Sequence, residues 1–188
     1  MIKAVIFDCF GVVITDTLES TYTRFGGDFQ KDLKEIIEIC RKSDKGEISS
    51  SAPYFAQLLG VTESTYTTAI AEGRIVNQEL LDYVNELKKD YRVAMLSNVG
   101  KGRLPQIFGE GFLEKYFELI VASGDIGYAK PEASAYEYVA EKLGVRLDEC
   151  VFTDDRPEYI EGAVGVGMKT ILFSNLEQFK KDLTRILE

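Results

Sequence analysis

The sequence contains no histidine and no tryptophan, and it has only three cysteines and four prolines among its 188 residues. The absence of histidine excludes Ser-His-Asp and Cys-His catalysis, zinc held by histidine, and a histidine general base. The cysteines are widely spaced and form no CxxC pair, so neither a disulfide framework nor a structural zinc site is supported. Any chemistry must therefore use carboxylates, lysines, hydroxyl groups or a metal ion held by oxygen ligands.

Positive charge is also scarce, since 31 acidic residues stand against 22 basic ones and give a formal net charge of −9. This balance, with no basic stripe, argues against nucleic-acid binding. No apolar run reaches the ~20 residues that a membrane helix needs, and Asp8 interrupts the N-terminal apolar stretch too early for a signal peptide. We therefore expect one globular, cytoplasmic domain with a small insertion, and neither nucleic acid nor membrane as a partner.

Five short apolar runs predict the strands of a buried sheet. They are residues 3–7, 92–96, 118–121, 150–153 and 169–173. Amphipathic helical patterns lie between and after these runs, at residues 77–89, 132–143, 157–167 and 175–187. Apolar strands that alternate with such helices are typical of an α/β fold with a doubly wound, Rossmann-like parallel sheet whose two faces are covered by helices.

Residues 17–75 interrupt this alternation because they contain no convincing buried strand. Residues 30–41 have the pattern of an amphipathic helix, and a polar loop and two further helical segments follow, near residues 53–59 and 63–72. An insert of this kind directly after the first strand predicts a small helical cap over the ligand-binding edge of the sheet. We expect residues 1–16 and 76–188 to form the core domain.

Polar residues follow three of the predicted strands at the point where each strand ends. Asp8 follows the first, Ser97 and Asn98 the second, and Asp154 and Asp155 the fourth. Ligands of open parallel sheets bind beyond the carboxyl ends of the strands. Helix capping accounts for any one of these residues, but not for adjacent acids after one strand together with an acid after another. The set therefore predicts a ligand site at this edge.

Four motifs, in this order, resemble those of the haloacid dehalogenase superfamily of aspartate-nucleophile hydrolases. They are VIFDCFGVV, AMLSNVG, the Lys-Pro pair of GDIGYAKPEASAYEYV, and CVFTDDRPEYIEGAVGVGMKTILF. The insert resembles the family's small helical cap of the C1 type, and KGEIS within it is similar to a stretch of related sugar-phosphate phosphatases. The resemblance covers nearly the whole chain and implies a hydrolase with an α/β core and a helical cap.

The resemblance implies that Asp8 is a nucleophile that attacks the phosphoryl group of a small phosphorylated metabolite and forms an aspartyl-phosphate. A negative nucleophile that approaches a negative phosphoryl group needs compensating positive charge, which Mg²⁺ supplies. The implied ligands are Asp8, Asp155 and the backbone carbonyl of Phe10. Asp154 is implied either as a further ligand or as support for the site.

The remaining motifs imply residues that position the reacting groups. Lys130 would pair with Asp8 and with phosphate oxygens, and so would take part in catalysis. Ser97 and Asn98, at the end of the second predicted strand, would bind the substrate, with the Ser97 hydroxyl and backbone amides holding the phosphoryl oxygens. The oligomeric state and the identity of the substrate have no signal in the sequence.

The chain departs from the family's pattern two residues after the nucleophile. Phosphatases of the superfamily carry a second aspartate there, which protonates the leaving oxygen and later activates water, whereas this chain has Phe10. General acid–base catalysis contributes about 10²–10⁴-fold, which is about 3–5 kcal/mol of barrier. The loss favours leaving groups that need little protonation, such as anomeric sugar, aryl and acyl phosphates. Asp16, Glu47 and a substrate hydroxyl are candidates for the missing acid.

Two alternatives stay open because of Phe10. The fold can persist as a non-catalytic or weakly active phosphate-binding or regulatory module. It can also be a hydrolase like the 2-haloacid dehalogenases, since a halide leaves without a proton and that branch has an aromatic residue at this position. However, that branch has small neutral residues where this chain has Asp154 and Asp155, and two added carboxylates would repel a haloacid. A Mg²⁺-dependent phosphatase is therefore the favoured interpretation.

Overall fold

A computed structural model describes residues 1–188, and its strands form one five-stranded sheet. The strand order is β3-β2-β1-β4-β5, and every neighbouring pair is parallel. All five predicted strands are present, and their bounds differ from the predicted ones by one residue at most. They are β1 (Ala4–Phe7), β2 (Arg92–Ser97), β3 (Leu119–Ala122), β4 (Cys150–Asp154) and β5 (Lys169–Leu172).

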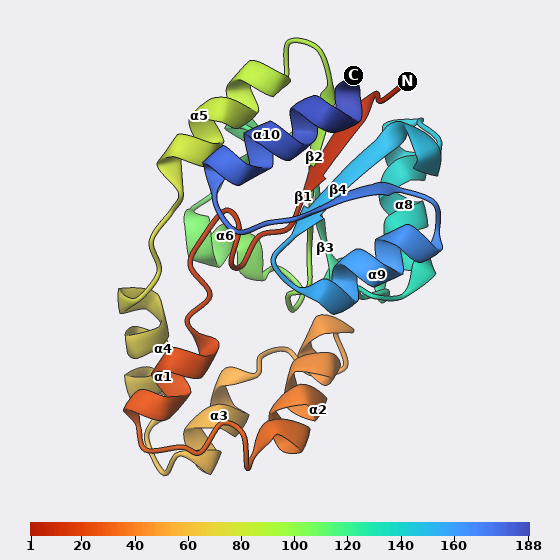
Figure 1. The fold of residues 1–188 in the computed structure, drawn as a ribbon. Coiled ribbons are helices and arrows are strands. Elements are labelled where there is room, and N and C mark those ends of the chain that lie inside the picture. The colour runs from red at the N-terminus through yellow and green to blue at the C-terminus, as the bar shows by residue number, and fades with distance from the viewer.

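Helices cover both faces of this sheet (Figure 1). Side chains alternate between the faces along each strand, so Val5 and Phe7 of β1 belong to one buried cluster and Ala4 and Ile6 to another. The first cluster is closed by α5 and α10, the second by α8 and α9. The predicted α/β fold with a parallel sheet is thereby confirmed. The bounds are α5 (Gln78–Leu87), α8 (Ala133–Leu143), α9 (Pro157–Gly165) and α10 (Leu176–Leu187).

Four further helices form a group with a core of its own. Tyr22, Ile36, Phe55 and Tyr66 are among the seven buried residues of this third cluster. Figure 1 shows the group beyond the carboxyl ends of the strands, on the side opposite the two chain termini. We refer to it as the cap, and its division from the core at residues 17 and 75 stays a proposal. The helices are α1 (Leu18–Arg24), α2 (Leu33–Asp44), α3 (Ala52–Leu58) and α4 (Glu63–Glu72).

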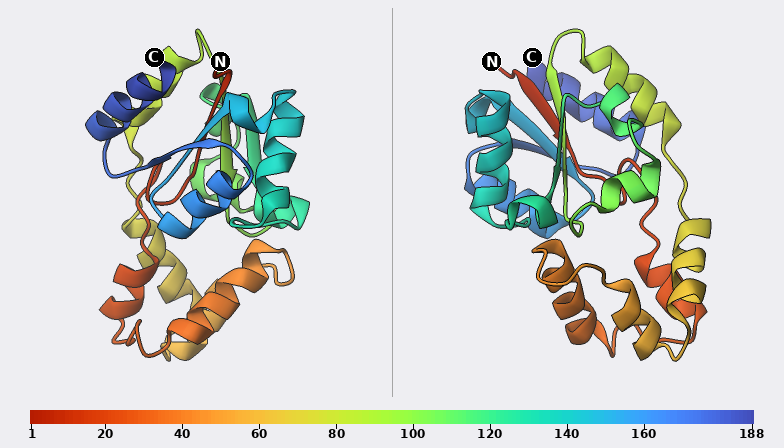
Figure 2. Two further views of the ribbon diagram at one scale, coloured as in Figure 1. Left: turned by 45° about the vertical axis from the view of Figure 1, so that its right-hand side comes forward. Right: turned by 180° about the vertical axis from the view of Figure 1, so that it is seen from behind.

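Two chain segments connect the cap to the core, and they are hydrogen-bonded to each other. The amide of Thr15 donates to the carbonyl of Ile75 (3.0 Å), and the amide of Asn77 donates to the carbonyl of Val13 (2.9 Å). These contacts hold the segment that enters the cap beside the segment that leaves it. The cap is therefore attached through one double linker, which Figure 2 shows from two sides.

The remaining elements are short, and the sequence pattern did not predict them. A helix of four to seven residues completes at most about two turns, too few for a hydrophobic period to stand out. The cap helix α1 belongs to this group as well. The others are α6 (Arg103–Phe108), α7 (Ser123–Ile126) and the 3₁₀ turns at Leu113–Lys115 and Leu147–Glu149. No helix in the structure has both the length and the apolar character required to span a bilayer.

Candidate active site

Three carboxylates meet at the carboxyl edge of the sheet. One oxygen of each of Asp8, Asp154 and Asp155 lies within 4.8 Å of the others. The register of the neighbouring strands β1 and β4 causes this, because Phe7 pairs with Thr153 and the amide of Asp8 donates to the carbonyl of Thr153 (2.9 Å). Asp8, directly after β1, and Asp154, at the end of β4, are thereby brought side by side. We call these three residues the carboxylate cluster.

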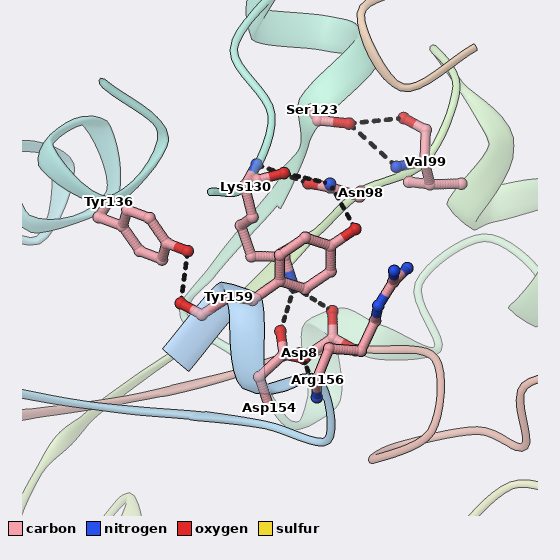
Figure 3. Close-up of polar contacts among 9 residues, drawn as sticks. All are labelled: Asp8, Asn98, Val99, Ser123, Lys130, Tyr136, Asp154, Arg156 and Tyr159. Atoms are coloured by element: carbon pink, nitrogen blue, oxygen red, sulfur yellow. Dashed lines mark hydrogen bonds and ion pairs between the residues drawn. The ribbon is translucent and has the colours of Figure 1, made fainter. Parts of the chain in front are cut away.

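Lys130 is the cation that faces the carboxylate cluster (Figure 3). Its ammonium group donates to Oδ1 of Asp8 and to Oδ2 of Asp154, the latter at 2.6 Å, and its side chain is fully buried. The ammonium also lies 4.8 Å from the ring centroid of Tyr159 and 5.3 Å from that of Phe152. A buried ammonium is tolerated only with such partners, so these contacts fix its position.

Asn98 positions the backbone of Lys130. Its Nδ2 donates to the Lys130 carbonyl (2.8 Å), and the Lys130 amide donates to its Oδ1 (2.9 Å). Nδ2 also lies 3.3 Å from the hydroxyl of Tyr159. Asn98 follows β2, so this double hydrogen bond ties the lysine loop to the centre of the sheet. That Asn98 binds the substrate stays a prediction, and the positioning role has no signal in the sequence.

The carboxylate cluster holds more negative charge than Lys130 balances. Burial raises the pKa of Asp8 above its ordinary value, and Lys130 opposes this while Asp154 adds to it. Burial, followed by repulsion from Asp154, raises the pKa of Asp155 to about 6. Burial pushes the pKa of Lys130 down, but Asp8 and Asp154 outweigh it and hold it above its usual range. The lysine is therefore a fixed positive charge, and the site favours a second cation.

The two adjacent acids at the end of β4 have different surroundings. Both oxygens of Asp154 are engaged, because Oδ2 accepts from Lys130 and Oδ1 accepts from the amide of Arg156 (2.9 Å). Oδ1 of Asp155 is buried and accepts no hydrogen bond. A buried carboxylate oxygen without a partner is costly unless something binds it. The local geometry therefore fits Asp155 as a ligand and Asp154 as its support.

The backbone after Asp8 leaves room for this arrangement. Gly11 has a φ of +88°, and a Cβ atom at this position would lie 2.2 Å from Oδ2 of Asp155. Only glycine combines that dihedral angle with so close an approach. The carbonyl of Phe10 accepts no hydrogen bond from another backbone amide. Oxygen donors of these two kinds, carboxylate and carbonyl, are those that Mg²⁺ prefers.

A cavity of about 840 Å³ lies between the carboxylate cluster and the cap. Asp8, Asn98, Lys130 and Asp155 line it from the core, whereas Ser97 does not. Ser97 is fully buried, and its hydroxyl has no hydrogen-bond partner. Its predicted contact with the phosphoryl oxygens stays a prediction. The cap contributes a mainly apolar wall, which includes Phe29, Leu33, Ile36, Phe55, Tyr66 and Ile70.

The structure separates the candidates for the missing acid. Phe10 itself lines the cavity, and so does Asp16, whose Oδ1 accepts the amide of Leu18 (2.9 Å). Glu47 does not line the cavity, and it pairs with Arg41 (2.6 Å) on the surface of the cap. Glu47 is therefore not placed to reach a substrate at the carboxylate cluster in this conformation.

Asp44, the last residue of α2, is a cavity-lining acid that the sequence analysis missed. Burial raises its pKa to about 7, and the positive charges of Lys130 and Arg156 oppose this shift. A carboxyl group that titrates near neutral pH can both donate and accept a proton there. Asp44 lies in a polar stretch of the sequence where no spacing or motif distinguishes it from its neighbours.

Comparison with known proteins gives consistent results at the levels of family and fold. A family model described as haloacid dehalogenase-like hydrolase matches residues 2–167. The D-ribitol-5-phosphate phosphatase of Bacteroides thetaiotaomicron is 26% identical over 206 residues, which cover 100% of this chain and 99% of that protein. The drimenol cyclase drtB of Aspergillus calidoustus is 28% identical over 200 residues, and this chain spans only 37% of its length.

A solved structure shares the fold. It is described as an enzyme of the haloacid dehalogenase (HAD) family from Bacteroides thetaiotaomicron, in complex with magnesium and inorganic phosphate. Its TM-score is 0.74 at 24% sequence identity, and the alignment covers 93% of this chain and 95% of that one. At this identity the likeness concerns the arrangement of sheet and cap.

Proposed function

Since the chain belongs to the haloacid dehalogenase-like hydrolases, we propose that it is a Mg²⁺-dependent phosphatase that hydrolyses a small phosphomonoester through an aspartyl-phosphate on Asp8. The observation that carries this proposal is the carboxylate cluster with its single lysine at the wall of a large cavity. A 2-haloacid would bring its own carboxylate toward three others, whereas a phosphomonoester with Mg²⁺ would bring a balancing positive charge.

Asp8 is held in the orientation of a nucleophile. Lys130 binds Oδ1, so Oδ2 is the oxygen left to attack the phosphorus atom. The attack forms the Oδ2–P bond, and the bond from phosphorus to the leaving oxygen breaks. Water then cleaves the aspartyl-phosphate and releases inorganic phosphate. Because the lysine stays protonated, it stabilises the charge on the carboxylate and on a phosphoryl oxygen beside it.

Mg²⁺ fits the donors that this chain presents. Asp8, Asp155 and the carbonyl of Phe10 would hold it, with Asp154 supporting Lys130 and the backbone at Arg156. Bound there, the ion would supply positive charge to the phosphoryl oxygens during attack. Phe10 offers no proton to the leaving oxygen, so we expect aryl, anomeric and acyl phosphates to react faster than alkyl phosphates.

The first test is phosphate release from aryl, sugar-1- and alkyl phosphates, measured with Mg²⁺ and with EDTA. We expect release that requires Mg²⁺ and that Asp8→Asn lowers by about 10³-fold or more. Glu19→Gln is the matched control, because Glu19 is a cavity-lining carboxylate on α1, outside the cluster. Asp155→Asn is expected to abolish the rise in melting temperature that Mg²⁺ produces in the unmodified protein.

Other outcomes point to the alternatives. Binding of Mg²⁺ without phosphate release above the Asp8→Asn background would favour a phosphate-binding module. Halide release from a 2-haloacid without added metal would favour the dehalogenase interpretation. Equal phosphate release by Asp8→Asn and the unmodified protein would refute the nucleophilic role of Asp8.

A further inference from the structure

Six cationic side chains line the cavity, and two of them have no acidic partner. Arg74 and Arg103 take part in none of the ion pairs of the structure. The other four cations are each paired with an acid. The pairs are Arg41 with Glu47, Lys45 with Glu132, Lys130 with Asp8 and Asp154, and Arg156 with Glu158.

The two unpaired arginines line the same cavity. Burial lowers the pKa of Arg74, and the positive charge of Arg103 lowers it further. The Nε atom of Arg74 is buried and donates to no acceptor. A partly buried guanidinium whose Nε lacks an acceptor, and which a second positive charge disfavours, is better satisfied when an anion joins the two. This arrangement is notable in a chain whose net charge is −9, where acids outnumber bases.

The two arginines approach the cavity from different parts of the fold. Arg74 belongs to the segment that leaves the cap after α4, and Arg103 begins α6 in the core. Arg103 is held by its Nη1, which donates to Oε1 of Gln106 (2.6 Å). Asp16 also lines the cavity, but it makes no ion pair with either arginine. Neither arginine therefore makes an ion pair, and the negative charge of Asp16 only partly offsets the lowering of the Arg74 pKa.

We propose that Arg74 and Arg103 form a subsite for an anionic group on the leaving part of the substrate. The substrate would then carry a carboxylate or a second phosphate in addition to the phosphoryl group that Asp8 attacks. The subsite and Asp8 line the same cavity, so one molecule can contact both. This inference rests on the proposed phosphatase function, and it adds the class of substrate.

Guanidinium groups bind carboxylates and phosphates through charge-assisted hydrogen bonds. One such bond to a charged group changes affinity by about 10- to 100-fold. We therefore expect a substrate with the second anion to have a kcat/KM at least about tenfold above that of its neutral analogue. Most of the difference should be in KM, because the group binds away from the reacting phosphorus atom.

The experiment compares aryl phosphates that differ only in a remote group. 4-(Carboxymethyl)phenyl phosphate carries a carboxylate, 4-(phosphonomethyl)phenyl phosphate carries a phosphonate, and 4-(2-hydroxyethyl)phenyl phosphate is the neutral control. A methylene group separates each substituent from the ring, which keeps the acidity of the leaving phenols similar. The larger of the two preferences over the neutral control identifies the kind of anion that the subsite takes.

Arg74→Gln and Arg103→Gln should each abolish most of this preference and leave the neutral substrate unchanged within about twofold. Arg74→Lys, which keeps the positive charge, should retain part of it. Lys101→Gln is the matched control, because Lys101 is exposed, lies two residues from Arg103 and does not line the cavity. Melting temperatures of all variants identify any that fail to fold.

Binding to Asp8→Asn separates the failure of this proposal from the failure of the proposed function. In that variant we expect the carboxymethyl compound to bind at least about tenfold more tightly than the hydroxyethyl compound, and Arg74→Gln to remove the difference. Equal binding of the two compounds would overturn the subsite even if the enzyme hydrolyses both. A preserved binding preference in Asp8→Asn, together with no turnover by the unmodified protein, would support the subsite and refute the phosphatase.

Discussion

The two walls of the cavity differ in how their charged groups are satisfied. On the core wall, Asp8, Lys130 and Asp154 are buried and joined by ion pairs that leave the lysine no freedom. The cap wall is mainly apolar, and one of its acids, Asp44, has no ion-pair partner. Groups that must react need fixed geometry. Groups that only recognise a ligand can lack a partner until the ligand binds. The difference suggests that the chemistry belongs to the core wall, whereas recognition draws on both walls, since Arg103 lies in the core and Arg74 in the segment that leaves the cap.

The largest effect should come from removing the cation of the core wall. Lys130→Met would leave Asp8 and Asp154 buried and facing each other without a positive charge. Breaking a buried ion pair in this way costs about 3–5 kcal/mol of the free energy of unfolding. Urea denaturation at constant ionic strength measures it. Adding Asp154→Asn to the same chain should restore part of the loss, because one of the two unpaired charges is then absent.

A surface ion pair between cap and core provides the matched comparison. Lys45 pairs with Glu132 at 2.5 Å, and these side chains are 30% and 39% exposed. Exposed pairs contribute about 0–1 kcal/mol, so Lys45→Met should change the free energy of unfolding by less than about 1 kcal/mol. If Lys130→Met and Lys45→Met lower the free energy of unfolding by the same amount, the contrast between the core wall and the cap wall would be wrong.

A second prediction concerns the source of the missing proton. Phe10→Asp places a carboxyl group on the core wall two residues after the nucleophile, in contact with the cavity. We expect it to speed hydrolysis of alkyl phosphates by about 10- to 100-fold, which is within the range of general acid catalysis, and to affect aryl phosphates much less. Steady-state rates on both substrate classes measure this.

Phe10→Asn controls for the loss of the ring, since asparagine has the size of aspartate but donates no proton at neutral pH. An equal acceleration of alkyl and aryl phosphates, or the same gain in Phe10→Asn, would show that the size of the Phe10 side chain, and not proton transfer, limits the rate of hydrolysis. No gain in Phe10→Asp would indicate that the cap already supplies the proton, which would weaken the division between the two walls.

The core wall could be predicted from the sequence because parallel strands bring their carboxyl ends together. Asp8, Asn98 and Asp154 follow short apolar runs, and the structure places all three at one edge of the sheet. The family resemblance favoured Asp155 as a ligand and left Asp154 either as a further ligand or as support. Their difference depends on which oxygens Lys130 and the neighbouring amide occupy, and side-chain hydrogen bonds of this kind leave no periodic signal.

The cap wall could be predicted only as a group of helices. Asp44 and Arg74 reach the cavity because of the angle at which α2 and the linker meet the core, and a residue pattern does not encode that angle. Amphipathic spacing identifies the buried side of a cap helix, but a cavity lined by apolar residues has the same spacing as a packed core. Residues that recognise a ligand there look like ordinary charged residues.

The smallest expected effect tests the charge of the cap wall through its pH dependence. Burial raises the pKa of Asp44 from the ordinary 3.8 to about 7, against the pull of Lys130 and Arg156. Between these values the unfolded chain has lost the proton that the folded chain keeps, so the contribution of Asp44 to stability falls as the pH rises from about 4 to about 7. Below this window the group is protonated in both states and costs nothing, and above it the full penalty for a buried charge is present.

Asp44→Asn removes a group that ionises, so the variant should exceed the unmodified protein in free energy of unfolding by about 1 kcal/mol or more at pH 8, and should match it near pH 4. Urea denaturation in EDTA at both pH values measures the difference without a contribution from bound metal. A stability difference of the same size at both pH values would mean that packing, not charge, distinguishes the variant. In that outcome Asp44 would not be a titrating group on the cap wall, and the proton for a poor leaving group would have to come from the solvent or from the substrate itself.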